Sequence, residues 1–337
     1  PRYSSSAASD VYKRQDIDDN IFYMSNARLS VRDSLVDWRE LILGDQSSLI
    51  LDEYHPYEDL PKMINPTSGY IFNTNNSPFN STAELENLKE EDYNSTFSFM
   101  EEENNRSIRF MELIDEYEKL SYEDFKDIKY DQQYPDSILY IGNISQIFDL
   151  DKSEFPNYEN LIDLIQNWDR RGDIENIGAA QWSLYYSYML DVLSENDLNV
   201  KDTIDIKFHL DALEKTKARL MNNFGKLDIR LGDIQRLVRG DKSLPVSGLI
   251  DMIAPTYSVP MEGGKVRAVS GESYIMLIKY SEDGPEVETI LPYGNSSNPS
   301  SPHYTDQMKM YTEKKLKKMS LDKDESLSRA VRIYSPN

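Results

Sequence analysis

The spacing of hydrophobic residues divides the chain into a strand-like beginning and a helical middle. Between residues 16 and 105, short apolar runs alternate with polar turns, and residues 21–27 and 70–72 are predicted strands. From 105 to 224, apolar residues recur at helical spacing. This spacing predicts helices with two buried faces, formed by Leu161, Leu164, Ile165 and Trp168, and by Trp182, Tyr186, Met189 and Leu193.

Strand-like patterns return after Gly225. Residues 273–280 form an apolar run that predicts a buried strand, and Asp283-Gly284 predicts a hairpin turn after it. The whole pattern therefore predicts an α+β fold. We expect strands from both ends of the chain to meet in one sheet region, and the helices of residues 105–224 to form a separate lobe.

Two helix starts carry local signals. Ser121 followed by Asp124 is typical of a capping box, in which each residue's side chain bonds the other's backbone N–H group. Ser301 followed by Pro302 predicts a helix with the serine as N-cap and the proline as first helical residue.

Aromatic and histidine side chains invite functional interpretations, but packing explains them more simply. We expect Tyr54 and Tyr57 to be packed, and His55 beside Pro56 to lie at the surface. His209 is predicted to be a packed or half-exposed histidine, because no second ligand residue accompanies it at metal-binding spacing.

Residues 65–79 hold the most distinctive pattern, a turn followed by a short apolar run and an amide-rich second turn. Asparagine-rich turns usually do no more than bond their own backbone. The segment nevertheless reads Asn-Pro-x-Ser-Gly-aromatic and then Asn-x-Asn-Asn-x-Pro, and in this order it resembles the penicillin amidase (acylase) family of N-terminal-nucleophile hydrolases. The resemblance implies that Asn75 donates its amide to the oxyanion of the tetrahedral intermediate.

Two further segments resemble the same family, in the family's order. Arg109, followed by Glu112 and Leu113, matches a helix whose arginine steadies the oxyanion asparagine. Residues 301–307, Ser-Pro-His-Tyr-Thr-Asp-Gln, match its C-terminal signature, closest to the branch of aculeacin and acyl-homoserine lactone acylases. The implied catalytic residues are Asn75 and Arg109, and the implied fold is a partial αββα sandwich with a large helical lobe.

The resemblance also implies which parts of an acylase are present. Residues 16–337 are expected to be the C-terminal part of the family's β chain, and residues 1–15 to be a non-native leader. The N-terminal nucleophile, the α chain and the start of the β chain are expected to lie outside this sequence, so the fragment alone should be inactive. The family implies autoproteolytic processing, a periplasmic or secreted location with a signal peptide in the missing part, and a small-molecule amide substrate, which would connect it to antibiotic or quorum-signal metabolism.

Composition narrows the alternatives. With 59 acidic and 37 basic residues the net charge is −22, which disfavours nucleic acid and anionic membranes as partners. There is no cysteine, and Gly-x-Ser-x-Gly, P-loop and zinc-helix patterns are absent. Two acidic stretches that begin at Asp16 and Asp149 fail the EF-hand pattern. No cofactor is predicted, and the structural calcium of some family members finds no support.

A second function class fits the composition. Acidic, tyrosine-rich and cysteine-free chains also occur among secreted, non-catalytic carbohydrate- or peptide-binding proteins. That interpretation predicts no ordered match to the acylase segments.

Overall fold

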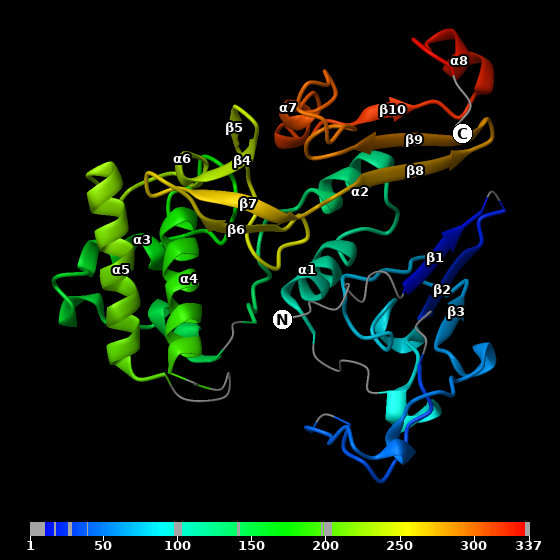
Figure 1. Ribbon diagram of the computed structural model, residues 1–337, viewed down its shortest axis with the longest axis horizontal. Helices are drawn as coiled ribbons and strands as arrows, with labels where there is room; N and C mark the ends of the chain where they lie inside the picture. The colour runs from blue at the N-terminus through cyan, green and yellow to red at the C-terminus, as the bar shows by residue number, and fades with distance from the viewer. Residues whose placement is uncertain are drawn as a thin grey trace. The chain divides into compact units, whose positions relative to one another are not determined.

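The computed structural model describes residues 11–16, 18–25, 29–38, 40–97, 103–139, 142–196, 198 and 204–333 (Figure 1). The chain forms two compact units. The first comprises Pro1–Ser107 with Tyr280–Gly284, and the second comprises Ile108–Lys279 with Pro285–Asn337. No helix within the described ranges is long and apolar enough to cross a membrane.

The first unit contains an antiparallel sheet of three short strands. Its order is β1 (Val11–Gln15), β2 (Ile21–Ser25) and β3 (Lys62–Ile64), drawn as blue arrows in Figure 1. The predicted strand at 21–27 is therefore present, although its last two positions lie outside the described residues. Residues 11–15 of the expected leader pair with β2, and their non-native origin stays a prediction.

The predicted strand at 70–72 is wrong, because this segment is extended but belongs to no sheet. The Phe72 N–H group donates to the carbonyl of Ser81 at 2.9 Å. The Tyr70 carbonyl instead accepts from the Thr82 hydroxyl at 2.8 Å. The Thr82 side chain thus occupies the carbonyl that the backbone of a neighbouring strand would bond, and no ladder of backbone hydrogen bonds forms.

Short 3₁₀ turns carry the chain between these elements, at Ser47–Leu49, Tyr57–Asp59, Glu84–Glu86, Glu90–Asp92 and Ser95–Phe97.

The aromatic residues near the second of these turns differ from expectation. Tyr54 and Tyr57 are 43% and 53% exposed, so the packing predicted for them is wrong. The His55 side chain, expected at the surface, is only 7% exposed. Its ring packs edge-on against the ring of Phe97, with 4.6 Å between the ring centroids. Phe97 lies 42 residues further along the chain, so the sequence around His55 did not indicate this burial.

The helices predicted between 105 and 224 are present. They are α1 (Asn105–Ile114), α2 (Tyr122–Lys129), α3 (Glu159–Gln166), α4 (Ala179–Glu195) and α5 (Ile206–Phe224), with 3₁₀ segments at Gly142–Phe148 and Lys152–Glu154. The capping box of Ser121 and Asp124 is confirmed at the start of α2. Shorter helices are α6 (Leu231–Ile234), α7 (Met308–Thr312) and α8 (Lys323–Ser328).

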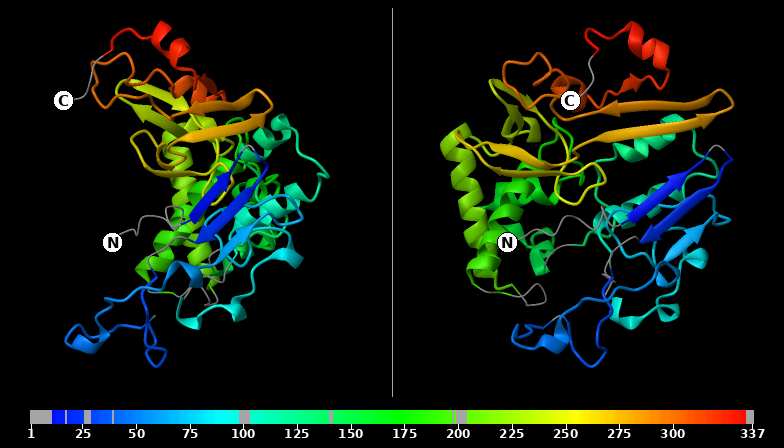
Figure 2. Two further views of the ribbon diagram at one scale, coloured as in Figure 1. Left: turned by 90° about the vertical axis from the view of Figure 1, so that its right-hand side faces the viewer. Right: turned by 45° about the vertical axis from the view of Figure 1, so that its right-hand side comes forward.

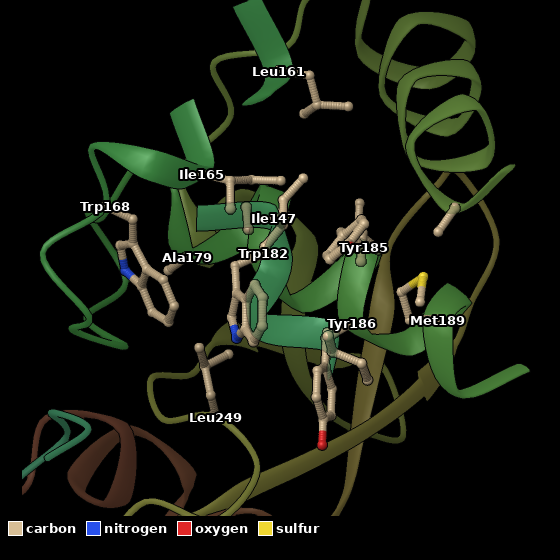
Figure 3. Close-up of a cluster of buried hydrophobic side chains, with 14 of the residues drawn as sticks. Ile147, Leu161, Ile165, Trp168, Ala179, Trp182, Tyr185, Tyr186, Met189 and Leu249 are labelled. Carbon is tan, nitrogen blue, oxygen red and sulfur yellow. The ribbon is translucent and has the colours of Figure 1, made fainter. Parts of the chain in front are cut away.

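The largest buried cluster is built by α3, α4 and α5, and both views of Figure 2 draw α4 and α5 side by side. Trp182 is 1% exposed and stacks on Trp168 with 5.8 Å between ring centroids (Figure 3). The predicted stripe on α4 is therefore core. His209 on α5 is fully buried, and its Nδ1 lies 2.5 Å from the hydroxyl of Tyr185.

The second unit has two sheets, although the tip of the β8–β9 hairpin, Tyr280–Gly284, belongs to the first unit. One has the order β5 (Lys242–Pro245), β4 (Gln235–Arg239), β7 (Val266–Gly271), β6 (Thr256–Pro260), and the other β10 (Lys317–Met319), β9 (Gly284–Ile290), β8 (Ile275–Ser281). The strand expected at 273–280 is present as β8 but is buried on one face only.

The expectation that strands from both ends share one sheet is wrong, since β2 and β8 belong to different sheets. β8 instead has β9 as its neighbour, across a turn in which Gly284 adopts a φ of 103°. Pairing across a short turn costs less loop-closure entropy than pairing with a strand some 250 residues away. The α+β class itself is confirmed by the mixture of helices and sheets.

The helix expected to begin at Pro302 begins at Met308. The Ser301 hydroxyl accepts from the His303 N–H group at 3.2 Å and closes a turn instead of capping a helix. Gln307 then ties this turn to the preceding loop: its N–H group donates to Tyr293 at 2.9 Å, and its Oε1 accepts from the Leu291 N–H group at 3.1 Å. The C-terminal signature is thus a structural junction.

Candidate active site

Asn75 occupies a turn that its neighbours hold in place. Its φ of 68° lies in the left-handed region, which asparagine tolerates better than most residues. Its N–H group donates to Oδ1 of Asn73 at 3.1 Å, and the N–H group of Thr74 donates to Oδ1 of Asn76 at 2.7 Å. These side chain-to-backbone bonds are the ones that asparagine-rich turns favour, and here they fix an unusual backbone conformation.

The start of α1 supplies the second half of the site, all of it within the first unit. Asn104 and Ser107 cap the helix reciprocally: the Ser107 N–H group donates to Oδ1 of Asn104 at 2.9 Å, and the Asn104 N–H group donates to Oγ of Ser107 at 3.1 Å. Nδ2 of Asn104 also donates to the carbonyl of Thr74 at 3.1 Å. The cap therefore holds the helix start against the turn that carries Asn75.

Arg106, in the first turn of α1, donates from Nη1 to Oδ1 of Asn75 at 2.8 Å. A guanidinium has donors and no acceptor, so the oxygen of the Asn75 amide must face Arg106. The amide nitrogen Nδ2 must then face the other way. It is buried and has no hydrogen-bond partner among the described residues.

A buried, unpartnered N–H donor is costly in a folded protein unless a ligand or a reacting group accepts from it. Here the donor is uncharged, its orientation is fixed by a cation, and its backbone is fixed by neighbouring amides. An oxyanion hole requires these properties, since it must stabilise negative charge that develops only during the reaction.

The loops around the site are braced by two carboxylates. Glu103 accepts from Nδ2 of Asn80 at 2.6 Å and also from the hydroxyl of Ser107. Glu86 accepts from the hydroxyl of Thr67 and from the N–H groups of Thr67 and Ser68, the latter at 2.7 Å. These hydrogen bonds, of which the one from the Thr67 side chain has the largest effect, lower the pKa of Glu86 to about 2. The turn before the Asn75 segment is therefore clamped by an ionised side chain.

Arg109, the arginine predicted to hold Asn75, makes other bonds. Its Nε and Nη2 atoms donate to the two carboxylate oxygens of Asp131, each at 3.1 Å, and Nη1 donates to Glu112 at 3.1 Å. Burial lowers the pKa of Arg109, but its bonds to Asp131 and Glu112 outweigh this effect and raise it. The proposed convergence of Asn75 and Arg109 would join the two units and stays a prediction.

Sequence reasoning missed Arg106 and Asn104. A signal for Arg106 was present, because a cation in the first turn of a helix is opposed by the helix dipole and needs another reason to be there. Asn104 could have been recognised as an N-cap followed three residues later by a reciprocal partner, Ser107. The described residues include no cluster of three or more histidine, aspartate or glutamate side chains that could hold a metal ion.

The fold resembles that of a known acylase. The structure of thermostable penicillin G acylase from Alcaligenes faecalis superposes with a TM-score of 0.54, covering 96% of this chain and 67% of that one at 16% sequence identity. At this identity the likeness establishes the fold, and it confirms the expected partial fold of an N-terminal-nucleophile hydrolase.

The family model described as penicillin amidase matches residues 14–327. The chain belongs to the penicillin amidase family.

Curated relatives match shorter segments. Acyl-homoserine lactone acylase PvdQ of Pseudomonas fluorescens Pf-5 is 37% identical over 83 residues, which are 24% of this chain and 11% of that protein. The PvdQ of Pseudomonas syringae pv. tomato is 26% identical over 168 residues, 44% of this chain and 22% of that protein. Aculeacin-A acylase of Actinoplanes utahensis is 30% identical over 94 residues, 25% of this chain and 11% of that protein. Each match thus spans less than a quarter of the relative's length.

Proposed function

We propose that this chain is part of an amide hydrolase, an acylase, and that it supplies the oxyanion hole of the active site. The observation that carries the proposal is the Asn75 amide, whose oxygen is held by Arg106 at 2.8 Å and whose buried nitrogen has no partner among the described residues. Family membership supports the proposed reaction class, and the geometry of the turn supports the role proposed for Asn75.

In the proposed reaction a nucleophile attacks the carbonyl carbon of an N-acyl amide, and the carbonyl oxygen becomes an oxyanion. Nδ2 of Asn75 donates to that oxygen, while Arg106 keeps the amide from turning over. Because the donor is already oriented, no reorganisation is needed as charge develops. The nucleophile is proposed to be a serine, cysteine or threonine at a processed chain start outside residues 1–337, with its own α-amino group as base.

Substrate, partners and location belong to the same proposal. The substrate class is a small-molecule acyl amide, such as an acyl-homoserine lactone, a lipopeptide or a β-lactam side chain. The α chain and the start of the β chain complete the enzyme, this fragment alone is inactive, and the whole protein works in the periplasm or outside the cell after autoproteolysis. The relatives' names and the family support the acyl amide substrate class.

The test is an assay of the complete protein for amine release from N-acyl-homoserine lactones, a lipopeptide and a β-lactam. Expected is hydrolysis of at least one substrate, lost when the nucleophile is replaced. The competing interpretation, a non-catalytic binding protein, predicts saturable ligand binding with no amine release. It also predicted that no ordered family match would exist, whereas the match covers residues 14–327.

A further inference from the structure

A cavity of about 450 Å³ lies in the second unit, at one end of the sheet β5-β4-β7-β6. This volume is within the range of small-molecule sites. Apolar side chains from the sheet and the loop after β9 form part of its wall, among them Leu237, Val246, Ala268 and Leu291. Polar and charged residues of the wall include Arg239 and Glu272. We call it the Arg239 cavity.

Arg239, the last residue of β4, is held rigidly by aromatic rings. Its guanidinium carbon lies 4.8 Å from the ring centroid of Tyr293 and 4.4 Å from that of Tyr304. Nη2 donates to the carbonyl of Ser296 at 2.9 Å. These contacts fix the plane of the guanidinium while most of its five donors stay available.

Within the described parts of the chain, Arg239 has no carboxylate partner. Glu272, the acidic residue of the cavity wall, forms an ion pair with Lys129. This arrangement is unusual in a chain of net charge −22, where acidic residues outnumber basic ones. The Arg239 cavity therefore combines an uncompensated planar cation with apolar walls.

A second, smaller cavity of about 20 Å³ shares the lining residues Val246, Thr256, Glu272 and Tyr311 with the first. Its volume suits one water molecule. Gln132 lines it, is 5% exposed, and has an Oε1 atom without a partner among the described residues. Where the two cavities share lining residues, the wall therefore includes polar groups as well as apolar ones.

We propose that the Arg239 cavity binds a small alkyl or aryl carboxylate. The carboxylate accepts from the guanidinium nitrogens that Ser296 leaves available, since the planar fork of arginine matches a carboxylate. The apolar body of the ligand lies against Leu237, Val246 and Ala268. The proposal does not depend on the proposed function, although amide hydrolysis would release compounds of this class.

Calorimetric titration of the complete protein with octanoate and benzoate tests the proposal. We expect saturable binding of both carboxylates. The alcohols octan-1-ol and benzyl alcohol should bind about tenfold or more weakly than the corresponding acids, because a hydrogen bond to a charged group contributes about 1.5–3 kcal/mol. Arg239→Met should weaken octanoate binding by a similar factor. Arg267→Met is the matched control, since this exposed arginine on β7 does not line the cavity.

A second variant keeps the test decisive if Arg239→Met does not fold. Ser270→Trp places a large side chain at an exposed lining position and should abolish binding while Arg239 is intact. Unchanged affinity in these variants would overturn the proposal, because the carboxylate would then be bound elsewhere, for example in the active site. Arg239-dependent binding of inorganic phosphate as tight as that of octanoate would also overturn it, in favour of a phosphate site.

Discussion

Nη1 of Arg106 lies 2.8 Å from Oδ1 of Asn75, although the two residues are 31 positions apart in the sequence. This bond decides which end of the Asn75 amide is free to act. If the amide turned over, two groups that only donate would face each other, so the bond fixes Nδ2 as the outward donor. The predictions for the active site follow from this relationship.

Replacing Asn75 by alanine should lower kcat of the complete enzyme by roughly 10²–10³ with little change in KM, because an oxyanion donor acts mainly in the transition state. Steady-state kinetics of amine release measure both constants. Asn94→Ala is the matched control, an exposed asparagine of the same unit. Near-wild-type turnover in Asn75→Ala would contradict the site assignment and leave the family membership untouched.

Arg106 and Arg109, three residues apart on α1, should differ in what their loss changes. Arg106→Met should lower kcat with a small change in thermal midpoint, because it releases the Asn75 amide. Arg109→Met should lower stability by about 3–5 kcal/mol, because it leaves the nearly buried carboxylate of Asp131 unpaired. Parallel kinetics and thermal denaturation separate the two roles. A kcat loss confined to Arg109→Met would restore Arg109 as the residue that holds Asn75.

Asn104 should be a positioning residue that acts through Thr74. Asn104→Asp keeps the oxygen that caps α1 but loses the Nδ2 donor to the Thr74 carbonyl, whereas Asn104→Ala loses both. The Asn104→Asp variant should therefore keep the thermal midpoint of the wild type and still have a lower kcat. Ala should lower kcat and also cost about 1 kcal/mol of stability, the usual value of an N-cap. Equal kinetics for wild type and Asn104→Asp would show that the tether to Thr74 has no effect on catalysis.

His209 should make the second unit less stable as pH falls. Burial lowers the pKa of His209 to about 4, so the folded protein keeps a neutral imidazole where an unfolded histidine, with a pKa near 6.5, takes up a proton. The stabilisation is complete above about pH 6.5 and is lost by up to about 1.4 kcal/mol per pH unit down to about pH 4.

Urea denaturation followed by tryptophan fluorescence measures this loss, since Trp182 and Trp168 lie in the same buried cluster as Tyr185, the partner of His209. His209→Gln keeps an acceptor for the Tyr185 hydroxyl and removes the titration. Its unfolding free energy should therefore fall less steeply between about pH 6.5 and about pH 4. Identical slopes for the variant and the wild type would refute the assignment.

Periodicity and local caps predicted the helical parts of the fold well. The α4 stripe of Trp182 and Met189 is buried, and the capping box at Ser121 forms as expected, because both depend on residues within a few positions of each other. Segments that pair with residues distant in the sequence were harder to predict. The run at 70–72 has strand-like residues, but the Thr82 hydroxyl occupies the carbonyl of Tyr70, and no local pattern indicates that.

The candidate site shows the same limit. The amide-rich turn marked Asn75, but no local pattern indicated that Arg106 contacts it. The expected contact between Arg109 and Asn75 rested on resemblance and stays a prediction. Which arginine reaches the turn depends on where α1 begins, and the cap formed by Asn104 and Ser107 sets that start at Asn105. A shift of three residues along a helix moves a side chain by almost one turn, so the choice required coordinates.

The left-handed backbone at position 75 restricts how this site can evolve. Asparagine, aspartate and glycine adopt such a conformation with the least strain, and most other residues would first have to reshape the turn. Glycine would keep the turn without any amide to donate, and in the proposed reaction an ionised aspartate would repel the developing oxyanion. Position 75 is therefore subject to one constraint from backbone geometry and another from charge, and asparagine meets both. Sequence changes that alter substrate preference in related proteins should consequently occur at residues around Asn75, while Asn75 itself stays unchanged.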